Sequence, residues 1–100
     1  MPKLAINHPH GLGQEEAVER LKGRFSLIKE DYKDEISSLE EHWNESSMSF
    51  RLVTRGVTVT GDVSVEPSQV NVDVQLPLVA MLLKGKIESR IRQRLGEILA

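Results

Sequence analysis

The feature that most constrains the fold is a regular alternation of apolar and polar residues in the second half of the chain. It runs through three segments: 48–52, 57–65 and 70–76. A period of two is typical of antiparallel strands with one buried and one solvated face. Arg55-Gly56 predicts a tight hairpin between the first two strands, and Glu66-Pro67-Ser68-Gln69 predicts a type I turn before the third. The apolar face of this meander needs a cover.

Two segments with helical spacing are predicted to supply that cover. Residues 14–33 carry one apolar stripe with spacings of three and four: Val18, Leu21, Phe25, Ile28 and Tyr32. The final helix begins at Leu76-Pro77, because proline suits the first helical turn. Its predicted buried stripe comprises Ala80, Leu83, Ile87, Ile91, Leu95 and Ile98, with Val79 at the margin.

Two further segments complete the sheet. Residues 3–8 predict a short edge strand, and residues 36–43 predict a strand bulged at Ser38-Leu39 and followed by a turn at residues 44–47. A helix continued to Trp43 is the alternative for 36–43. We therefore expect a single α+β domain over residues 1–100, with an antiparallel sheet of about five strands and two helices on one face, in the order β-α-β-β-β-β-α.

Composition narrows the functional classes. The net charge is -2, whereas nucleic-acid-binding domains are usually clearly basic. The chain has no cysteine, which excludes disulfides, thiolate nucleophiles and cysteine metal ligands. The longest apolar run falls short of the roughly 20 residues that span a bilayer, and the first residues do not resemble a signal peptide. We expect a cytoplasmic protein without a transmembrane segment and without nucleic acid as a partner.

Residues with catalytic or metal-binding chemistry form no convincing set. His8 and His10 share a strand face, but no third metal ligand lies near them. His42 has no nucleophile or carboxylate at a defined spacing, and Glu40-Glu41 would point to opposite faces of a strand. Gly11-Leu12-Gly13 lacks the glycine spacing and the lysine of a phosphate-binding loop. We predict no catalytic residue, no metal and no cofactor, and hence not an enzyme.

The start of the final helix carries more apolar residues than one buried stripe can use. At about 100° per residue, Leu78 and Leu82 fall opposite the stripe, and Met81 lies well off it. Basic residues follow directly, as at interfacial helices that bury apolar side chains and keep lysines at the polar boundary. The predicted docking or interface residues are Leu78, Met81, Leu82, Lys84 and Lys86.

Three kinds of cover would account for this apolar patch. They are the loop at residues 8–12, a second copy in a homodimer, and docking on a lipid, polymer or protein surface. The arginine-rich run 90–94 is interpreted as a solvated helix face, because cations are favoured near a helix C-terminus.

Several short motifs resemble the small bacterial family called putative polyhydroxyalkanoic acid system proteins. They are His10-Gly11-Leu12-Gly13-Gln14-Glu15-Glu16-Ala17, Trp43 with Met48-Ser49-Phe50, and Leu76-Pro77 leading to Lys84-Gly85-Lys86-Ile87-Glu88, Ile91 and Leu95. The resemblance implies genes near those of storage-polyester metabolism and a granule-associated role, and it brings no established catalytic residues. Relative to shorter members, this chain has extra residues before Trp43, which puts the length of the first helix in doubt.

The sequence thus predicts a non-enzymatic accessory or binding protein, associated with polyhydroxyalkanoate granules through the apolar patch. Two alternatives remain. One is a small hydrophobic-ligand carrier, because two helices over a curved sheet can leave an apolar cavity, as in helix-grip proteins. The other is a homodimeric interaction module that uses the patch as its interface.

Overall fold

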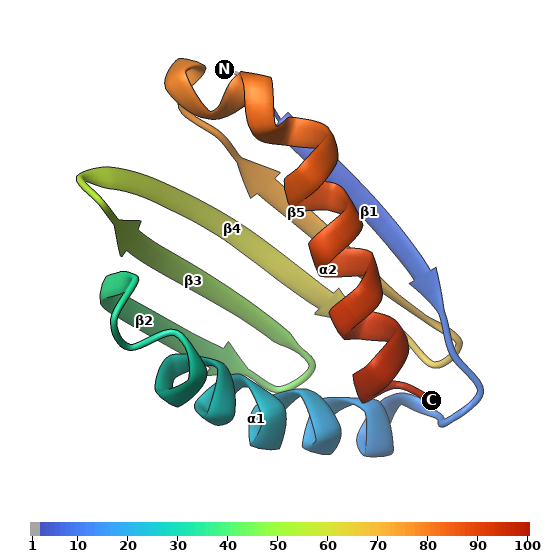
Figure 1. Cartoon of the computed structure of the whole chain (residues 1–100). Helices are drawn as coiled ribbons and strands as arrows, with labels where there is room; N and C mark the ends of the chain where they lie inside the picture. The colour runs from blue at the N-terminus through green and yellow to red at the C-terminus, as the bar shows by residue number, and fades with distance from the viewer. Residues whose placement is uncertain (1–2) are drawn as a thin grey trace.

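The computed structural model describes residues 3–100, apart from the side chains of residues 28 and 29. Its elements follow the predicted order β-α-β-β-β-β-α, with a short 3₁₀ helix before the last α-helix (Figure 1). In chain order they are β1 (Lys3–Pro9), α1 (Gln14–Asp31), β2 (Ile36–Asn44), β3 (Ser47–Thr54), β4 (Val57–Val65), β5 (Gln69–Gln75), η1 (Leu78–Leu83) and α2 (Lys84–Ile98). The predicted α+β class is confirmed.

The five strands form one antiparallel sheet in the order β1-β5-β4-β3-β2. The hairpin between β3 and β4 turns at Arg55 and Gly56, whose φ angles of 50° and 78° are the left-handed values that a tight two-residue hairpin requires. Residues 36–43 belong to β2, so the strand prediction is confirmed and the continued helix is wrong.

The predicted bulge in β2 lies slightly earlier than expected. The register shifts between Ile36 and Ser38, rather than at Ser38-Leu39. Because neighbouring residues of a strand point to opposite faces, one extra residue reverses the alternation. The bulge therefore lets Ile36 and Trp43, which are an odd number of residues apart, both face the helices.

Helix α1 connects the two edge strands and must cross the sheet to do so (Figure 1). Its 18 residues give a length of about 27 Å, which exceeds the roughly 19 Å across five strands. On its predicted stripe, Leu21 is buried and Val18 and Phe25 are half-buried, whereas the side chain of Ile28 lies outside the described residues. The helix ends at Asp31, two residues before the predicted end.

Helix α2 lies over β1 and β5 (Figure 1), and nearly all buried side chains of the sheet come from β1, β4 and β5. The buried core is almost entirely aliphatic: Leu4, Ile6, Ala17, Leu21, Met48, Val63, Val65, Val70, Val72, Val74, Leu76, Ala80, Leu95, Ile98 and Leu99. Since only Met48 comes from β2 or β3, the core is concentrated at one side of the sheet.

The buried stripe of the last helix is shorter than predicted. Ala80, Leu95 and Ile98 are buried, but Leu83 is 54% exposed and Val79 is 73% exposed, so both were placed wrongly. The reason is that η1 follows the end of β5 and projects past the sheet, where no strand of residues 3–100 covers these side chains (Figure 1).

Candidate functional site

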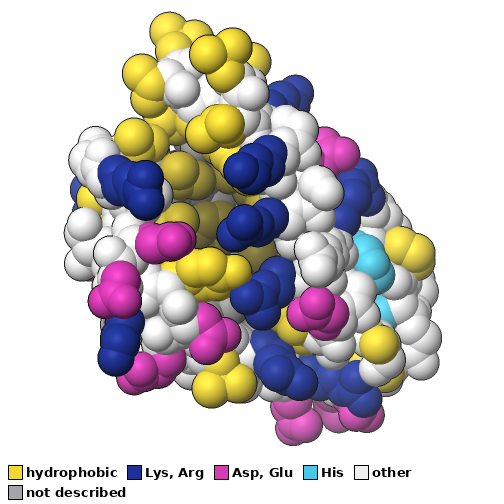
Figure 2. All heavy atoms as spheres, viewed as in Figure 1, with side chains coloured by type: hydrophobic (Ala, Val, Ile, Leu, Met, Phe, Trp, Pro, Cys, Tyr) yellow, Lys and Arg dark blue, Asp and Glu magenta, His cyan; other side chains and the backbone are white. Residues whose placement is uncertain are grey.

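The first candidate surface is η1 itself. Leu78 is 78% exposed, Leu82 is 96% exposed and Met81 is 39% exposed, as the sequence predicted for a patch off the buried stripe. Together with Val79 and Leu83 they form a cluster that we call the apolar tip, visible at the top of Figure 2. Lys84 and Lys86 are exposed immediately after it.

The loop at residues 8–12 does not cover this tip. It lies toward the other end of α2, where Arg92 donates a hydrogen bond to the backbone oxygen of Asn7. Likewise, a Cβ at Gly96 would lie 3.9 Å from His8 Nε2. Cover by this loop is therefore wrong, and the homodimer and the docking surface stay as predictions.

The second candidate site is an open cleft between the sheet and the two helices, with a volume of about 360 Å³. It exists because α2 covers β1 and β5 while α1 crosses the sheet toward β2, so that parts of β2 and β3 lack a helix above them (Figure 1). Figure 2 shows it as a hollow with an apolar floor, bordered by a row of basic side chains along α2. The cavity that a hydrophobic-ligand carrier requires is thus present.

The lining of the cleft contains every aromatic residue of the chain. The sequence has two phenylalanines, one tyrosine and one tryptophan, and Phe25, Tyr32, Trp43 and Phe50 all line the cleft. The remaining lining residues are Leu21, Glu35, Ile36, Met48, Leu52, Thr54, Val63, Val72, Arg90, Ile91, Arg94, Leu95 and Ile98. The aromatic residues therefore line the cleft together with part of the aliphatic core, namely Leu21, Met48, Val63, Val72, Leu95 and Ile98.

Phe50 is seated on the floor by a glycine in the neighbouring strand. It lies opposite Gly61 in the register of β3 and β4, and an ideal Cβ on Gly61 would lie 2.5 Å from the Phe50 ring. The ring also packs against Phe25 of α1, with centroids 6.3 Å apart and a tilt of 51°. These contacts fix two aromatic rings on the floor of the cleft.

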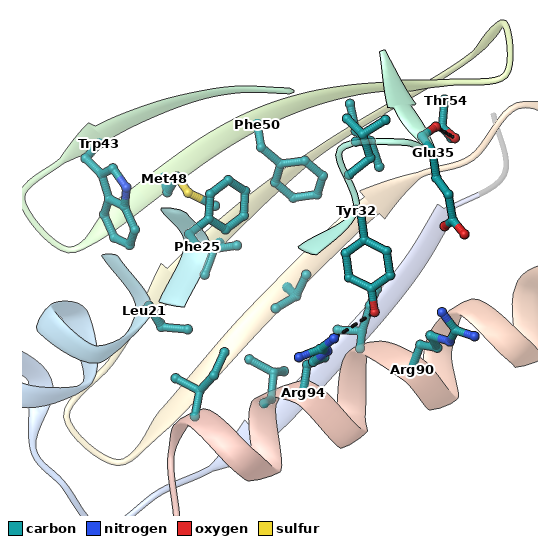
Figure 3. Close-up of a pocket in the computed structure, with 17 residues that line it drawn as sticks. Leu21, Phe25, Tyr32, Glu35, Trp43, Met48, Phe50, Thr54, Arg90 and Arg94 are labelled. Carbon is teal, nitrogen blue, oxygen red and sulfur yellow. Dashed lines mark hydrogen bonds between the residues drawn. The ribbon is translucent and has the colours of Figure 1, made fainter. Parts of the chain in front are cut away.

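Polar groups lie along one end of the cleft, away from Trp43 and Met48 (Figure 3). Arg94 donates a hydrogen bond of 2.7 Å to the hydroxyl oxygen of Tyr32, and its guanidinium carbon lies 5.5 Å from the centre of the Tyr32 ring. This hydrogen bond raises the pKa of Arg94 above its usual value. The pair joins the end of α1 to α2 across the cleft.

Arg90 lies one helical turn before Arg94 and also lines the cleft. Among the described side chains, it makes no ion pair or hydrogen bond within the usual distances. Arg92 differs, because it faces β1 and is engaged by Glu88 at 3.2 Å and by Asn7. The three arginines of the run 90–94 therefore have different environments.

The structure separates the other residues that the sequence singled out. His10 accepts from the backbone N–H of Leu12 and donates to the backbone oxygen of Glu66, so both ring nitrogens hold the turn after β1. No group of three or more His, Asp or Glu side chains within residues 3–100 is arranged to hold a metal ion. His42 is exposed on β2.

Glu40 and Glu41 diverge, as expected for neighbours on a strand. Glu41 accepts a hydrogen bond of 3.1 Å from the indole N–H of Trp43, on the cleft face, whereas Glu40 lies 4.0 Å from Arg51, its partner in the register of β3. The two carboxylates therefore do not form one site.

Sequence reasoning offered an apolar cavity between the sheet and the helices as an alternative, but it did not identify the residues that line the cleft or its polar end. The sequence did contain a pattern that points to the polar end. Arg90 and Arg94 are four residues apart, so they lie on one face of α2, beside the apolar stripe residues Ile91 and Leu95. Spacing along one helix cannot show what lies opposite it. That Tyr32 meets Arg94 depends on where α1 ends, which the sequence placed two residues too late.

The comparisons with known proteins agree with the motifs. The model of a family described as "Putative polyhydroxyalkanoic acid system protein" matches residues 4–99. No curated protein matches the chain. Within the part of the chain that the structure describes, no helix is long and apolar enough to cross a membrane.

Proposed function

Because this chain belongs to the family of putative polyhydroxyalkanoic acid system proteins, we propose that it is a non-enzymatic accessory protein that docks on polyhydroxyalkanoate granules in the cytoplasm through its apolar tip. The observation that supports this proposal most directly is the exposure of the tip. Leu78, Val79 and Leu82 are each at least 73% exposed, side by side at one end of the molecule.

The surroundings of the tip suit an interface between water and an apolar surface. Lys84 and Lys86 begin α2 directly behind η1, so their charged groups would stay in water while the leucines enter the surface. Because η1 projects past the sheet, the leucines can enter a surface without any rearrangement of the core.

The strength of docking can be tested through single leucines. One fully buried leucine contributes about 1.5–3 kcal/mol, so Leu82→Asp is expected to weaken binding to purified polyhydroxyalkanoate particles by about tenfold to 150-fold. Leu78→Asp combined with Leu82→Asp is expected to abolish co-sedimentation. Leu27→Asp is the matched control, since Leu27 is 50% exposed on α1 and lies outside the tip.

Two results would overturn this proposal. The first is co-sedimentation of the double variant at the level of the unaltered protein, with both proteins folded by circular dichroism. The second is light scattering that shows a stable dimer which Leu82→Asp converts to a monomer, because the tip would then be an interface between two copies.

A further inference from the structure

We propose that the cleft between the sheet and the two helices binds a single-chain amphipathic carboxylate, such as a medium-chain fatty acid. The carboxylate would lie at Arg90 and Arg94, and the alkyl chain would extend along β3 toward Trp43. This site is distinct from the apolar tip and does not depend on docking.

The apolar part of the cleft fits an extended chain. Its volume of about 360 Å³ falls in the range of roughly 300–1,000 Å³ that is usual for small-molecule sites. Alternate residues of β3 from Met48 to Thr54 line it, which corresponds to a length of about 20 Å. Phe25, Phe50 and Trp43 provide broad apolar contact at the end away from the arginines (Figure 3).

The polar end of the cleft fits a singly charged anion. Arg90 has no ion-pair partner among the described side chains. Arg94 is paired with Glu97 only at 4.0 Å and has further N–H donors besides the one that binds Tyr32. Glu35 lines the same end and contributes one negative charge. Together with Glu97, which lies 4.0 Å from Arg94, it reduces the positive charge at this end, so the site matches a singly charged carboxylate better than a doubly charged phosphate.

A second copy of the chain is a less suitable occupant. The only comparable exposed apolar cluster among the described residues is the tip, and inserting it would bring Lys84 and Lys86 toward Arg90 and Arg94. The repulsion between these like charges, in a contact that excludes water, opposes such an arrangement. A free carboxylate has the opposite charge, which favours its entry.

The position of Trp43 provides the measurement, because it is the sole tryptophan and lines the cleft. We would titrate the full chain with hexanoate, octanoate, decanoate and decanol at neutral pH, below the concentrations at which they form micelles, and follow tryptophan fluorescence. Affinity is expected to rise about fourfold for each methylene added to the acid. Decanoate is expected to bind about tenfold more tightly than decanol.

Two variants test the head-group position. Arg90→Gln is expected to weaken decanoate binding about tenfold and to leave decanol binding unchanged, because only the acid has a charge to lose. Arg92→Gln is the matched control: it removes the same charge from the same helix, but on the side that faces β1, and it should leave both affinities unchanged.

The proposal is wrong if decanoate gives no saturable change in folded protein, or if its affinity does not depend on chain length. Equal affinities for decanoate and decanol, or an Arg90→Gln variant that binds decanoate as the unaltered protein does, would also overturn it. So would a tryptophan spectrum that shifts with protein concentration alone while decanoate is excluded, since the cleft would then be filled by a second copy.

Discussion

Replacing Gly61 by alanine should destabilise the domain, because the new side chain would clash with residues on the floor of the cleft. The new Cβ would lie 2.5 Å from the Phe50 ring and 2.7 Å from the backbone oxygen of Asp73 in β5. Moving a backbone atom of the neighbouring strand is an overpacking cost of about 1–3 kcal/mol, and lifting Phe50 from Phe25 adds about 0.5–1.5 kcal/mol. Removing a glycine from a strand recovers about 0.5–1 kcal/mol. The net loss is therefore about 2 kcal/mol.

Urea and thermal unfolding followed by circular dichroism measure this loss. For a domain of this size, about 2 kcal/mol corresponds to a fall in Tm of roughly 8–16 °C. Gly23→Ala is the matched control, because a Cβ at Gly23 in α1 meets nothing within 4 Å and should raise stability by about 0.5–1 kcal/mol. If Gly61→Ala unfolds at the same temperature as the unaltered protein or higher, Phe50 is not seated on β4 as described.

Three other changes test separate contacts. Tyr32→Phe should lower the free energy of unfolding in urea by about 1 kcal/mol, because Arg94 loses a hydrogen-bond acceptor; an unchanged midpoint would contradict the bridge across the cleft. Asp73→Thr should raise stability by about 0.2–1 kcal/mol at low salt and by less at high salt, because Asp62 lies directly opposite in β4; a loss in thermal unfolding would refute this. Leu95→Ala should cost about 2–4 kcal/mol in urea, since Leu95 is 6% exposed, and a loss below about 1 kcal/mol would show that this position is not packed.

The sheet was predictable because its pattern is local. Alternation in β4 and β5 fixes which side chains are buried, and Val63, Val65, Val70, Val72 and Val74 are all buried as expected. The Arg55-Gly56 hairpin was likewise set by the residues themselves. The position of the bulge in β2 was predicted slightly wrongly, because it depends on the pairing with β3. The sequence of β2 alone does not determine that register.

The tip was predicted only in part, for a reason of the same kind. A helical wheel correctly placed Leu78 and Leu82 away from the sheet, but it assumed that the sheet continues beneath the whole helix. In the structure β5 ends at Gln75, so none of the described strands lies below Leu83, even though the helical wheel placed Leu83 on the buried side. Exposure there is decided by where the neighbouring element ends, which periodicity within the helix does not encode.

All four aromatic residues lie at the cleft, and none of them is fully buried. Aromatic side chains bury about 150–250 Å² each and usually dominate a core, yet here none of the four is among the buried residues. The buried core is formed by non-aromatic side chains, and Phe25, Trp43 and Phe50 pack against it. Phe25, Tyr32, Trp43 and Phe50 are instead half-buried around an open cavity, so each retains apolar surface that folding alone does not bury. A bound alkyl chain would cover that surface while the buried core stays unchanged, so the aromatic side chains that help to stabilise the domain would also form the binding surface.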